Sequence, residues 1–380
     1  MALNKNSKLY KDLYLSMKTQ TDPELQKDGA PILYVGDPGV GKTAILKEFC
    51  EMINHHVEVI ILGRLPSIDI GGMHVPDLEK GTLTHLISPR LLGEVDQEDG
   101  TEGVCIFLDE IGNTMEDQQT AIQSLLQDRS IDGKKMRDNV WFVMATNPSG
   151  SNCGSNEIIK SLKDRLCTVP ILSEFSTSSP SMDAVEGTYI SVQKDLFPMW
   201  LEECESLKIN DLVEAYNRYK EGESFHKFDH GSEDESQPSP RSWRKLSNLL
   251  NTGADLSELQ RLGPACVGRG EWAEFWGWTQ VRDQVTTFSE ILNDPDDCKV
   301  PSVTQPSHQY AVVMNIARGV KNMGDDISGE HIDSILSFLR RLPETFAAYG
   351  WKVAKKNNPE FTERSKNTSQ FIADYADSIR

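Results

Sequence analysis

One octapeptide restricts the folds open to this chain more than any other feature. Residues 36–43 read GDPGVGKT and fit the pattern G-x-x-x-x-G-K-[ST]. A short apolar run at 31–35 precedes the motif, and apolar residues at helical spacing follow it from Ile45 to Ile53. This order of strand, loop and helix is the context in which the pattern binds a phosphate chain, because backbone N–H groups and the positive helix N-terminus face the same anion.

Each position of the motif has a chemical reason. The glycines let successive N–H groups curl around phosphate, the Lys42 ammonium reaches the β and γ oxygens, and the Thr43 hydroxyl is a ligand for Mg²⁺. The motif therefore predicts a bound nucleoside triphosphate with Mg²⁺, and it does not select the base. The predicted nucleotide-binding residues are Gly36, Asp37, Pro38, Gly39, Val40, Gly41, Lys42, Thr43 and Ala44.

Two further apolar runs end in polar residues. The run 104–108 ends in Asp109 and Glu110, and the run 141–145 is followed by Thr146 and Asn147. Downstream of a P-loop, Asp109 is expected near the metal and Glu110 where it polarises a water; a binding-only protein needs the aspartate, and a hydrolase also needs the glutamate. The alternatives are a solvated acidic turn after the first run and an Asn-Pro turn after the second.

The apolar runs indicate the fold class. The runs at 31–35, 57–62, 104–108 and 141–145 alternate with helical patterns, such as 5–19 and 115–127 with Thr114 at its N-cap. Short buried strands that alternate with helices predict an α/β fold with a mostly parallel sheet and helices on both faces. Carboxyl ends of parallel strands share one edge, so the polar residues that follow the strands are expected together.

Beyond residue 171 the strand signal fades and helical patterns follow. We expect helices over 241–251, 271–292, 307–322, 328–350 and 368–380. The acidic stretch at 221–238 contains few large apolar residues and is predicted to be a mobile loop. The predicted divisions are an N-terminal helix at 1–28, an α/β nucleotide-binding core at 29–173, a helical lid at 174–253 and a helical C-terminal region at 254–380.

Composition narrows the function classes. Lys and Arg number 39 against 58 Asp and Glu, giving a net charge of −19, which disfavours nucleic acid as the main partner without excluding a small basic channel. No run approaches the roughly 18–20 apolar residues of a membrane span. The seven cysteines are scattered without a C-x-x-C pair, as expected of buried thiols in the reducing cytoplasm.

The order of these motifs resembles that of the AAA+ ATPases, and within them the MoxR-type branch related to dynein and midasin. Residues 65–72 (LPSIDIGG) resemble the segment after the second strand of the family. Residues 162–166 (LKDRL) resemble its Leu-x-Asp-Arg-Phe motif, with Leu in place of Phe, and residues 239–241 (SPR) resemble its lid motif. The resemblance covers residues 29–173 and about 239–250.

The resemblance implies a role for each matching residue. By position, Asp109 assists Mg²⁺, Glu110 is the general base, Asn147 is sensor 1 and Arg241 senses the γ-phosphate from the lid. Arg165 is the finger that enters the site of a neighbouring subunit.

Arg129 is a second candidate for the finger in trans. Its alternative is an ordinary cation at a helix end, which the helix dipole favours. An arginine beside the γ-phosphate contributes about 10³–10⁵ in rate.

The resemblance also implies the activity: Mg²⁺-dependent ATP hydrolysis by a homo-oligomeric ring, a hexamer, that remodels or activates a client protein in the manner of a chaperone. MoxR-type ATPases commonly work with a partner that carries a von Willebrand A-like domain. Three alternatives remain: a nucleic-acid-directed motor or helicase loader, a GTP-using relative, and a nucleotide-stabilised scaffold with little turnover.

Overall fold

The computed structural model describes residues 3, 5, 7–77, 82–86, 88–95, 100–131, 133–148, 157–177, 187–232, 234–282 and 286–379. The chain divides into two compact units. The core unit comprises Met1–Leu207, Phe225–Glu233 and Gln237–Ser242, and the helical unit comprises Lys208–Ser224, Asp234–Ser236 and Trp243–Arg380. Among the residues described, no helix is long and apolar enough to cross a membrane.

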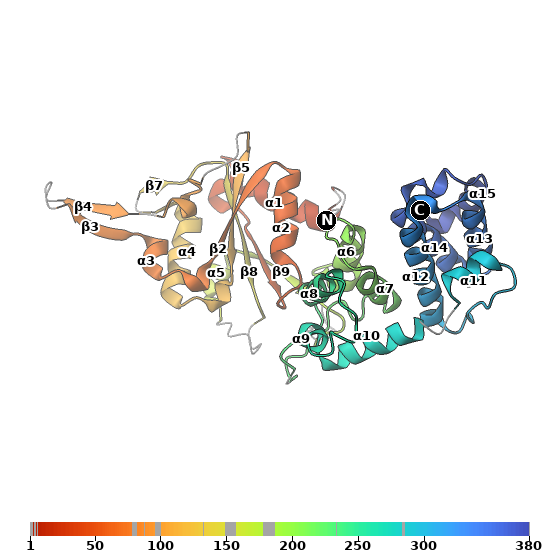
Figure 1. Ribbon diagram of the computed structural model, residues 1–380. Helices are drawn as coiled ribbons and strands as arrows, with labels where there is room; N and C mark the ends of the chain where they lie inside the picture. Colours follow the sequence, from red (N-terminus) through yellow and green to blue (C-terminus); the bar gives the residue numbers. More distant parts are fainter. Residues whose placement is uncertain are drawn as a thin grey trace. The chain divides into compact units, whose positions relative to one another are not determined.

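A six-stranded parallel sheet forms the centre of the core unit, with the strand order β10-β9-β1-β8-β5-β2 (Figure 1). The strands are β1 (Ile32–Gly36), β2 (His55–Ile61), β5 (Gly103–Asp109), β8 (Val140–Thr146), β9 (Cys167–Leu172) and β10 (Ile190–Ser191). The register aligns their carboxyl ends: Val35 lies opposite Thr146, and Ile61 lies opposite Asp109. The α/β class and the parallel sheet predicted from the sequence are confirmed.

Helices cover both faces of this sheet (Figure 1). On one face, Phe49 of α2 (Lys42–Met52) packs on Trp141 with ring centroids 5.9 Å apart. α1 (Lys8–Thr21) joins the same strand, since Gln20 accepts the Phe142 N–H at 2.8 Å. On the other face, Ile122 of α4 (Glu116–Asp128) belongs to one buried cluster with Phe142. Successive residues of β8 therefore pack against opposite helical layers.

The sequence did not indicate two short antiparallel hairpins in the core unit. They are β3 (Met73–Asp77) with β4 (Thr82–Leu86), and β6 (Ser130–Ile131) with β7 (Lys134–Lys135). The other elements of this unit are α3 (Ser67–Gly71), α5 (Lys160–Lys163), a π-helix at Val192–Leu196, α6 (Phe197–Glu203) and 3₁₀ turns at Gln26–Asp28, Leu62–Arg64, Pro89–Leu92 and Ile111–Asn113.

The start of α4 differs from the expected cap. Met115, not Thr114, occupies the N-cap position, and the Gln118 side chain accepts the Met115 N–H at 2.6 Å. The Thr114 hydroxyl instead donates to the Ile111 carbonyl of the preceding 3₁₀ turn.

The helical unit consists of helices in the part that the structure describes. Their bounds are α7 (Asp211–Tyr219), α9 (Leu262–Val267), α10 (Arg269–Arg282), α11 (Phe288–Asn293), α12 (Pro306–Met323), α13 (Gly329–Leu339), α14 (Glu344–Asn357), α15 (Asn367–Asp374) and α16 (Ala376–Ile379), with 3₁₀ turns at Gly324–Asp326 and Pro359–Thr362. α12, α13 and α14 lie side by side around a core that includes Ile316, Phe338 and Trp351 (Figure 1).

Three of the single helices predicted in this region are each divided into two in the structure. The pattern at 271–292 divides into α10 and α11, the pattern at 328–350 into α13 and α14, and the pattern at 368–380 into α15 and α16. Pro343 explains the second break, because a proline disfavours helical geometry in the residue before it.

The predicted divisions of the chain at 28, 173 and 253 stay predictions. The two observed units divide residues 174–253 between them, and their boundary falls within α8 (Pro240–Asn251). The expected loop at 221–238 rested on a lack of anchoring residues, and that premise was wrong. Phe225 is 1% exposed and His226 is 0% exposed, so this segment has a buried anchor.

Candidate nucleotide-binding site

The P-loop joins the carboxyl end of β1 to the first turn of α2, as its sequence context predicts. Gly39 has φ +83° and Gly41 has φ +102°, backbone conformations that a side chain disfavours. Gly41 is the N-cap residue of α2, so the N-terminal N–H groups of this helix begin at the loop. The backbone geometry is that of an anion-binding loop.

Lys42 connects the P-loop to the end of β8. Its side chain is nearly buried, at 9% exposure, and donates to the Gly36 carbonyl at 2.6 Å and the Asp37 carbonyl at 3.2 Å. It also donates to Asn147 Oδ1 at 3.2 Å. Two residues selected from separate motifs, 105 positions apart, therefore meet at one point.

Asp109 is the last residue of β5, and Glu110 follows it at the same sheet edge. Asp109 Oδ1 accepts the Glu110 N–H at 2.9 Å. Burial raises the pKa of the Asp109 carboxyl, while this hydrogen bond and the positive charges of Lys42 and Arg241 act to lower it. A desolvated carboxylate near two cations is a site where a metal ion is favourable, because the ion offsets the cost of burial.

Glu110 has a different environment from its neighbour. It is exposed, has φ 59°, and accepts a hydrogen bond from Asn113 Nδ2 at 3.3 Å. A left-handed conformation is costly for a residue with a Cβ, and such costs concentrate at functional sites. The backbone turn separates the two carboxylates, one partly buried and one in solvent.

Arg241 lies in the first turn of α8, within the core unit. The segment before it packs on the P-loop: a Cβ added to Gly39 would lie 2.9 Å from Ser239 Oγ and 3.5 Å from Arg241 Cβ. Gly39 thus permits close approach of the 239–241 segment.

The two finger candidates differ in their environments. Arg129 is held by its own subunit, since it donates to the Val140 carbonyl at 2.7 Å, and burial lowers its pKa. Arg165 follows α5, is partly exposed, and donates to the Ser161 carbonyl and to Gln127 Oε1, each at 2.7 Å. Both side chains are half-buried, but Arg129 donates to the carbonyl of the buried Val140, whereas Ser161 and Gln127, the partners of Arg165, are exposed.

Sequence reasoning missed the contribution of two histidines. His230 Nε2 lies 3.2 Å from Oδ1 of Asp37, whose side chain is 4% exposed. His226 is fully buried, its Nδ1 lies 3.2 Å from Ser176 Oγ, and burial lowers its pKa to about 4. Both histidines lie in or beside the acidic stretch, where the local pattern carried no signal for burial.

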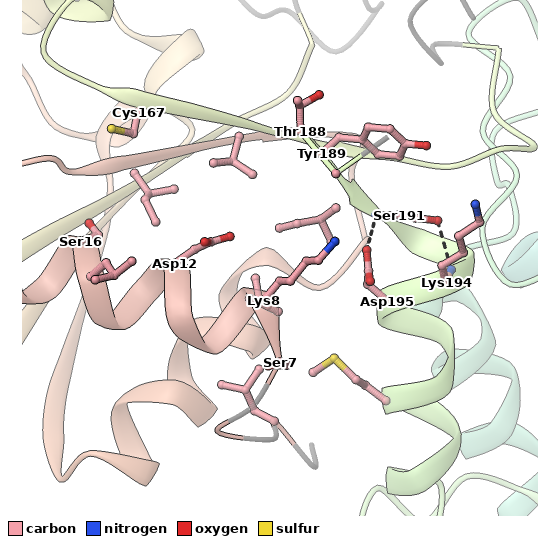
Figure 2. Close-up of a pocket in the computed structure, with 18 of the residues that line it drawn as sticks. Ser7, Lys8, Asp12, Ser16, Cys167, Thr188, Tyr189, Ser191, Lys194 and Asp195 are labelled. Carbon is pink, nitrogen blue, oxygen red and sulfur yellow. Dashed lines mark hydrogen bonds between the residues drawn. The ribbon is translucent and has the colours of Figure 1, made fainter. Parts of the chain in front are cut away.

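The core unit also contains a cavity of about 1060 Å³ away from these residues. It lies between α1 and the segment from β10 to α6, and Lys8, Asp12 and Asp195 line it (Figure 2). The P-loop does not contribute to the lining. Cys167 and Val169 of β9 also line this cavity.

The segment that contains most of these site residues matches the model of a known protein family. Residues 31–166 match the model of the AAA domain of the dynein-related subfamily. This segment is an AAA domain of that subfamily. Membership implies nucleotide binding, and the matched range includes the P-loop, Asp109, Asn147 and Arg165 but ends before Arg241.

No curated protein sequence matches the chain. Among solved structures, a proposed ATPase from Cytophaga hutchinsonii aligns at 14% identity and a TM-score of 0.27, over 55% of this chain and 61% of that one. A full-length MCM homologue from Methanopyrus kandleri aligns at 13% identity and a TM-score of 0.28, over 41% of this chain and 33% of that one. The RuvB Holliday junction branch migration motor of Thermotoga maritima aligns at 14% identity and a TM-score of 0.36, over 77% of this chain and 76% of that one.

Proposed function

We propose that the AAA domain binds ATP with Mg²⁺ and hydrolyses it to ADP and phosphate. The observation that carries this proposal is the arrangement at the carboxyl edge of the sheet. Lys42 ends the loop after β1, Asn147 follows β8 and Asp109 is the last residue of β5, and these three strands are adjacent. Glu110 lies beside them in solvent, and Arg241 adds positive charge. Such a set contains a phosphate-binding loop, a metal-binding carboxylate, a base and a sensor.

The residues present fit a Mg²⁺ ion. The buried Asp109 carboxyl has a raised pKa, so a divalent cation there would relieve the cost of its charge. The Thr43 hydroxyl, next to Lys42 in the first turn of α2, is a second oxygen ligand of the type Mg²⁺ takes. When bound, the ion neutralises charge on the phosphate oxygens.

Side chains of the protein carry out the other steps of hydrolysis. The Lys42 ammonium, now shared among three oxygens of the protein, exchanges them for phosphate oxygens. Glu110 is exposed to solvent and takes the proton from the attacking water. Asn147 orients that water, and Arg241 stabilises the charge that develops on the transferred phosphoryl group.

The proposal extends to a hexameric ring in which Arg165 enters the neighbouring site, because a partly exposed guanidinium is available to a second subunit. The cycle would move the 239–241 segment against the P-loop and so remodel a client protein, with a von Willebrand A-like partner, in the chaperone-like manner of the MoxR-type branch. The six described cysteines are free thiols, which supports a cytoplasmic location.

Phosphate release from ATP and from GTP tests the proposal. We expect Glu110→Gln to lower kcat by about 10²–10⁴ and to leave ATP binding within a fewfold, since the base acts on water and not on the nucleotide. Glu24→Gln, an exposed glutamate of the same unit, is the matched control and should not differ from wild type. Sizing the same samples with and without nucleotide tests the hexamer.

Other results would favour the alternatives. Stimulation of turnover by single- or double-stranded DNA favours a nucleic-acid motor, and faster turnover of GTP favours the GTP-using relative. Tight ATP binding with equal, negligible turnover in wild type and Glu110→Gln favours the scaffold.

The finger assignment has its own test. Arg165→Ala should abolish turnover that depends on assembly and leave the free energy of unfolding nearly unchanged. Arg129→Ala should lower that free energy by about 1–3 kcal/mol, because the Val140 carbonyl loses a charged donor. A selective loss of turnover in Arg129→Ala alone would reverse the assignment.

A further inference from the structure

A carboxylate within a phosphate-binding loop needs a physical explanation. Asp37 is the second residue of the P-loop, and its side chain is 4% exposed. A negative charge there opposes the binding of a nucleoside triphosphate, since like charges a few ångströms apart repel strongly where water is excluded. His230 Nε2 lies 3.2 Å from Asp37 Oδ1, and an ionised carboxylate can only accept, so the ring donates.

His230 belongs to a short segment held from two sides. We call residues 225–230 the strap. On one side, the Thr177 N–H donates to the Phe228 carbonyl, and the Phe228 N–H donates to Ser176 Oγ, both at 2.9 Å. The His230 N–H also donates to Thr177 Oγ1 at 3.1 Å.

On its other side the strap binds the segment that leads to α8. The Lys227 N–H donates to the Pro238 carbonyl at 3.1 Å, and Gln237 Nε2 donates to the Asp229 carbonyl at 2.9 Å. The Ser242 hydroxyl in turn donates to the Gln237 carbonyl at 2.6 Å. The strap is therefore linked by hydrogen bonds to the first turn of α8, where Arg241 lies.

The start of the strap is fixed by packing. Phe225 is 1% exposed and lies against Phe197 and Trp200 of α6, with ring centroids 5.1 and 4.9 Å away. A segment anchored by a buried aromatic residue and several backbone hydrogen bonds holds the imidazole of His230 at a defined position. Its far end meets the P-loop at Asp37.

We propose that His230 is a positioning residue that sets the affinity of the P-loop for the phosphate chain of ATP and ADP. By binding the Asp37 carboxylate it reduces the repulsion between this group and phosphate. The strap also couples the position of the Ser239–Arg241 segment to the P-loop, since it contacts both. This inference rests on the proposed nucleotide site and deepens it.

Equilibrium binding of fluorescent ATP and ADP analogues tests the proposal in the full chain. We expect His230→Ala to raise the Kd of both nucleotides about 5–30-fold, because a hydrogen bond to a charged group is lost. In the Asp37→Asn background the same substitution should change Kd less than twofold, since no charge remains to be paired. At saturating ATP, the kcat of His230→Ala should stay within about twofold of wild type, and the weaker binding should appear as a higher KM. His308→Ala, in the helical unit, is the histidine control.

A structural role alone would give a different pattern. If His230→Ala weakens binding equally with and without the Asp37 carboxylate, or leaves Kd unchanged, the proposal is overturned. Hydrogen exchange of the backbone amides 37–43 adds a measurement that needs no nucleotide: His230→Ala should accelerate it, and unchanged exchange contradicts the strap. If wild type binds no nucleotide, the proposed function fails, and the exchange data alone decide whether the strap holds the P-loop.

Discussion

The contact between Gly39 and Ser239 supplies a quantitative test of the candidate site. At φ +83°, alanine at position 39 costs about 1–2 kcal/mol in backbone conformation alone. Its Cβ would also lie 2.9 Å from Ser239 Oγ. That hydroxyl is not free to swing away, since it lies 2.8 Å from Ser242 Oγ and accepts the Ser242 N–H at 3.1 Å.

The steric cost can be separated from the backbone cost by a double-mutant cycle. Moving the Ser239 hydroxyl sacrifices the hydrogen bond that caps α8, a loss of about 0.5–2 kcal/mol. We therefore expect Gly39→Ala to lower the free energy of unfolding by about 2–3 kcal/mol. In the Ser239→Ala background, Gly39→Ala should lower the free energy of unfolding by about 1 kcal/mol less. The backbone cost is the same in both backgrounds and cancels, so the difference measures the steric contact alone.

Urea unfolding of the nucleotide-free protein measures this cycle. Gly41→Ala is the matched control: it lies at φ +102°, yet no described atom lies within 4 Å of the added Cβ, so its cost should add to that of Ser239→Ala. If the Gly39 and Ser239 substitutions also add within about 0.3–0.5 kcal/mol, the two residues are not in contact. Arg241 would then have no demonstrated place at the P-loop.

Three further predictions follow from two buried carboxyl groups and from the space around two helical glycines. Asp109→Asn should stabilise the ligand-free protein increasingly as the pH rises above about 4, because burial raises the pKa of the carboxyl and its ionisation opposes folding. The same substitution should abolish the rise in melting temperature that Mg²⁺ and ATP cause in wild type. Glu271→Gln should flatten the pH dependence of unfolding above about pH 4.5 for the same reason, with wild type losing stability as the pH rises. Gly277→Ala should stabilise α10 by about 0.5–1 kcal/mol, because no described atom outside the local helix backbone lies within 4 Å of the added Cβ. Gly319→Ala meets the Phe288 ring and should destabilise the protein by about 1–3 kcal/mol in denaturant unfolding; equal effects would contradict the packing of α11 on α12.

The central sheet could be predicted because its strands are buried on both faces. Val104 to Leu108 have 0% exposure, and such strands appear in a sequence as continuous apolar runs. Polar residues directly after the runs then mark the shared carboxyl edge. The meeting of Lys42 and Asn147 follows from this rule, although they are 105 positions apart.

The strap could not be predicted by the same reasoning. Phe225 is the one large apolar residue in a short buried run at 224–226 within a polar segment, and the run shows no helix or strand periodicity. The burial of this run depends on Phe197, Trp200 and Ser176, which lie 25 to 50 positions earlier. Low apolar content therefore indicated a mobile loop where tertiary contacts supply the anchor.

The sequence motifs alone did not decide which arginine is the finger, and the structure separates the two candidates. Sequence position left Arg165 and Arg129 as alternatives, since both follow helices. The Arg129 side chain donates to Val140, the first residue of β8, whereas Asn147 follows the last residue, Thr146. Six steps of about 3.3 Å separate these two ends of the strand by about 20 Å, so Arg129 lies away from its own nucleotide edge. To reach a neighbouring site, its guanidinium would have to leave a buried carbonyl unpaired, a cost of about 1–3 kcal/mol. The partners of Arg165 are exposed, so water can replace that arginine at a lower cost.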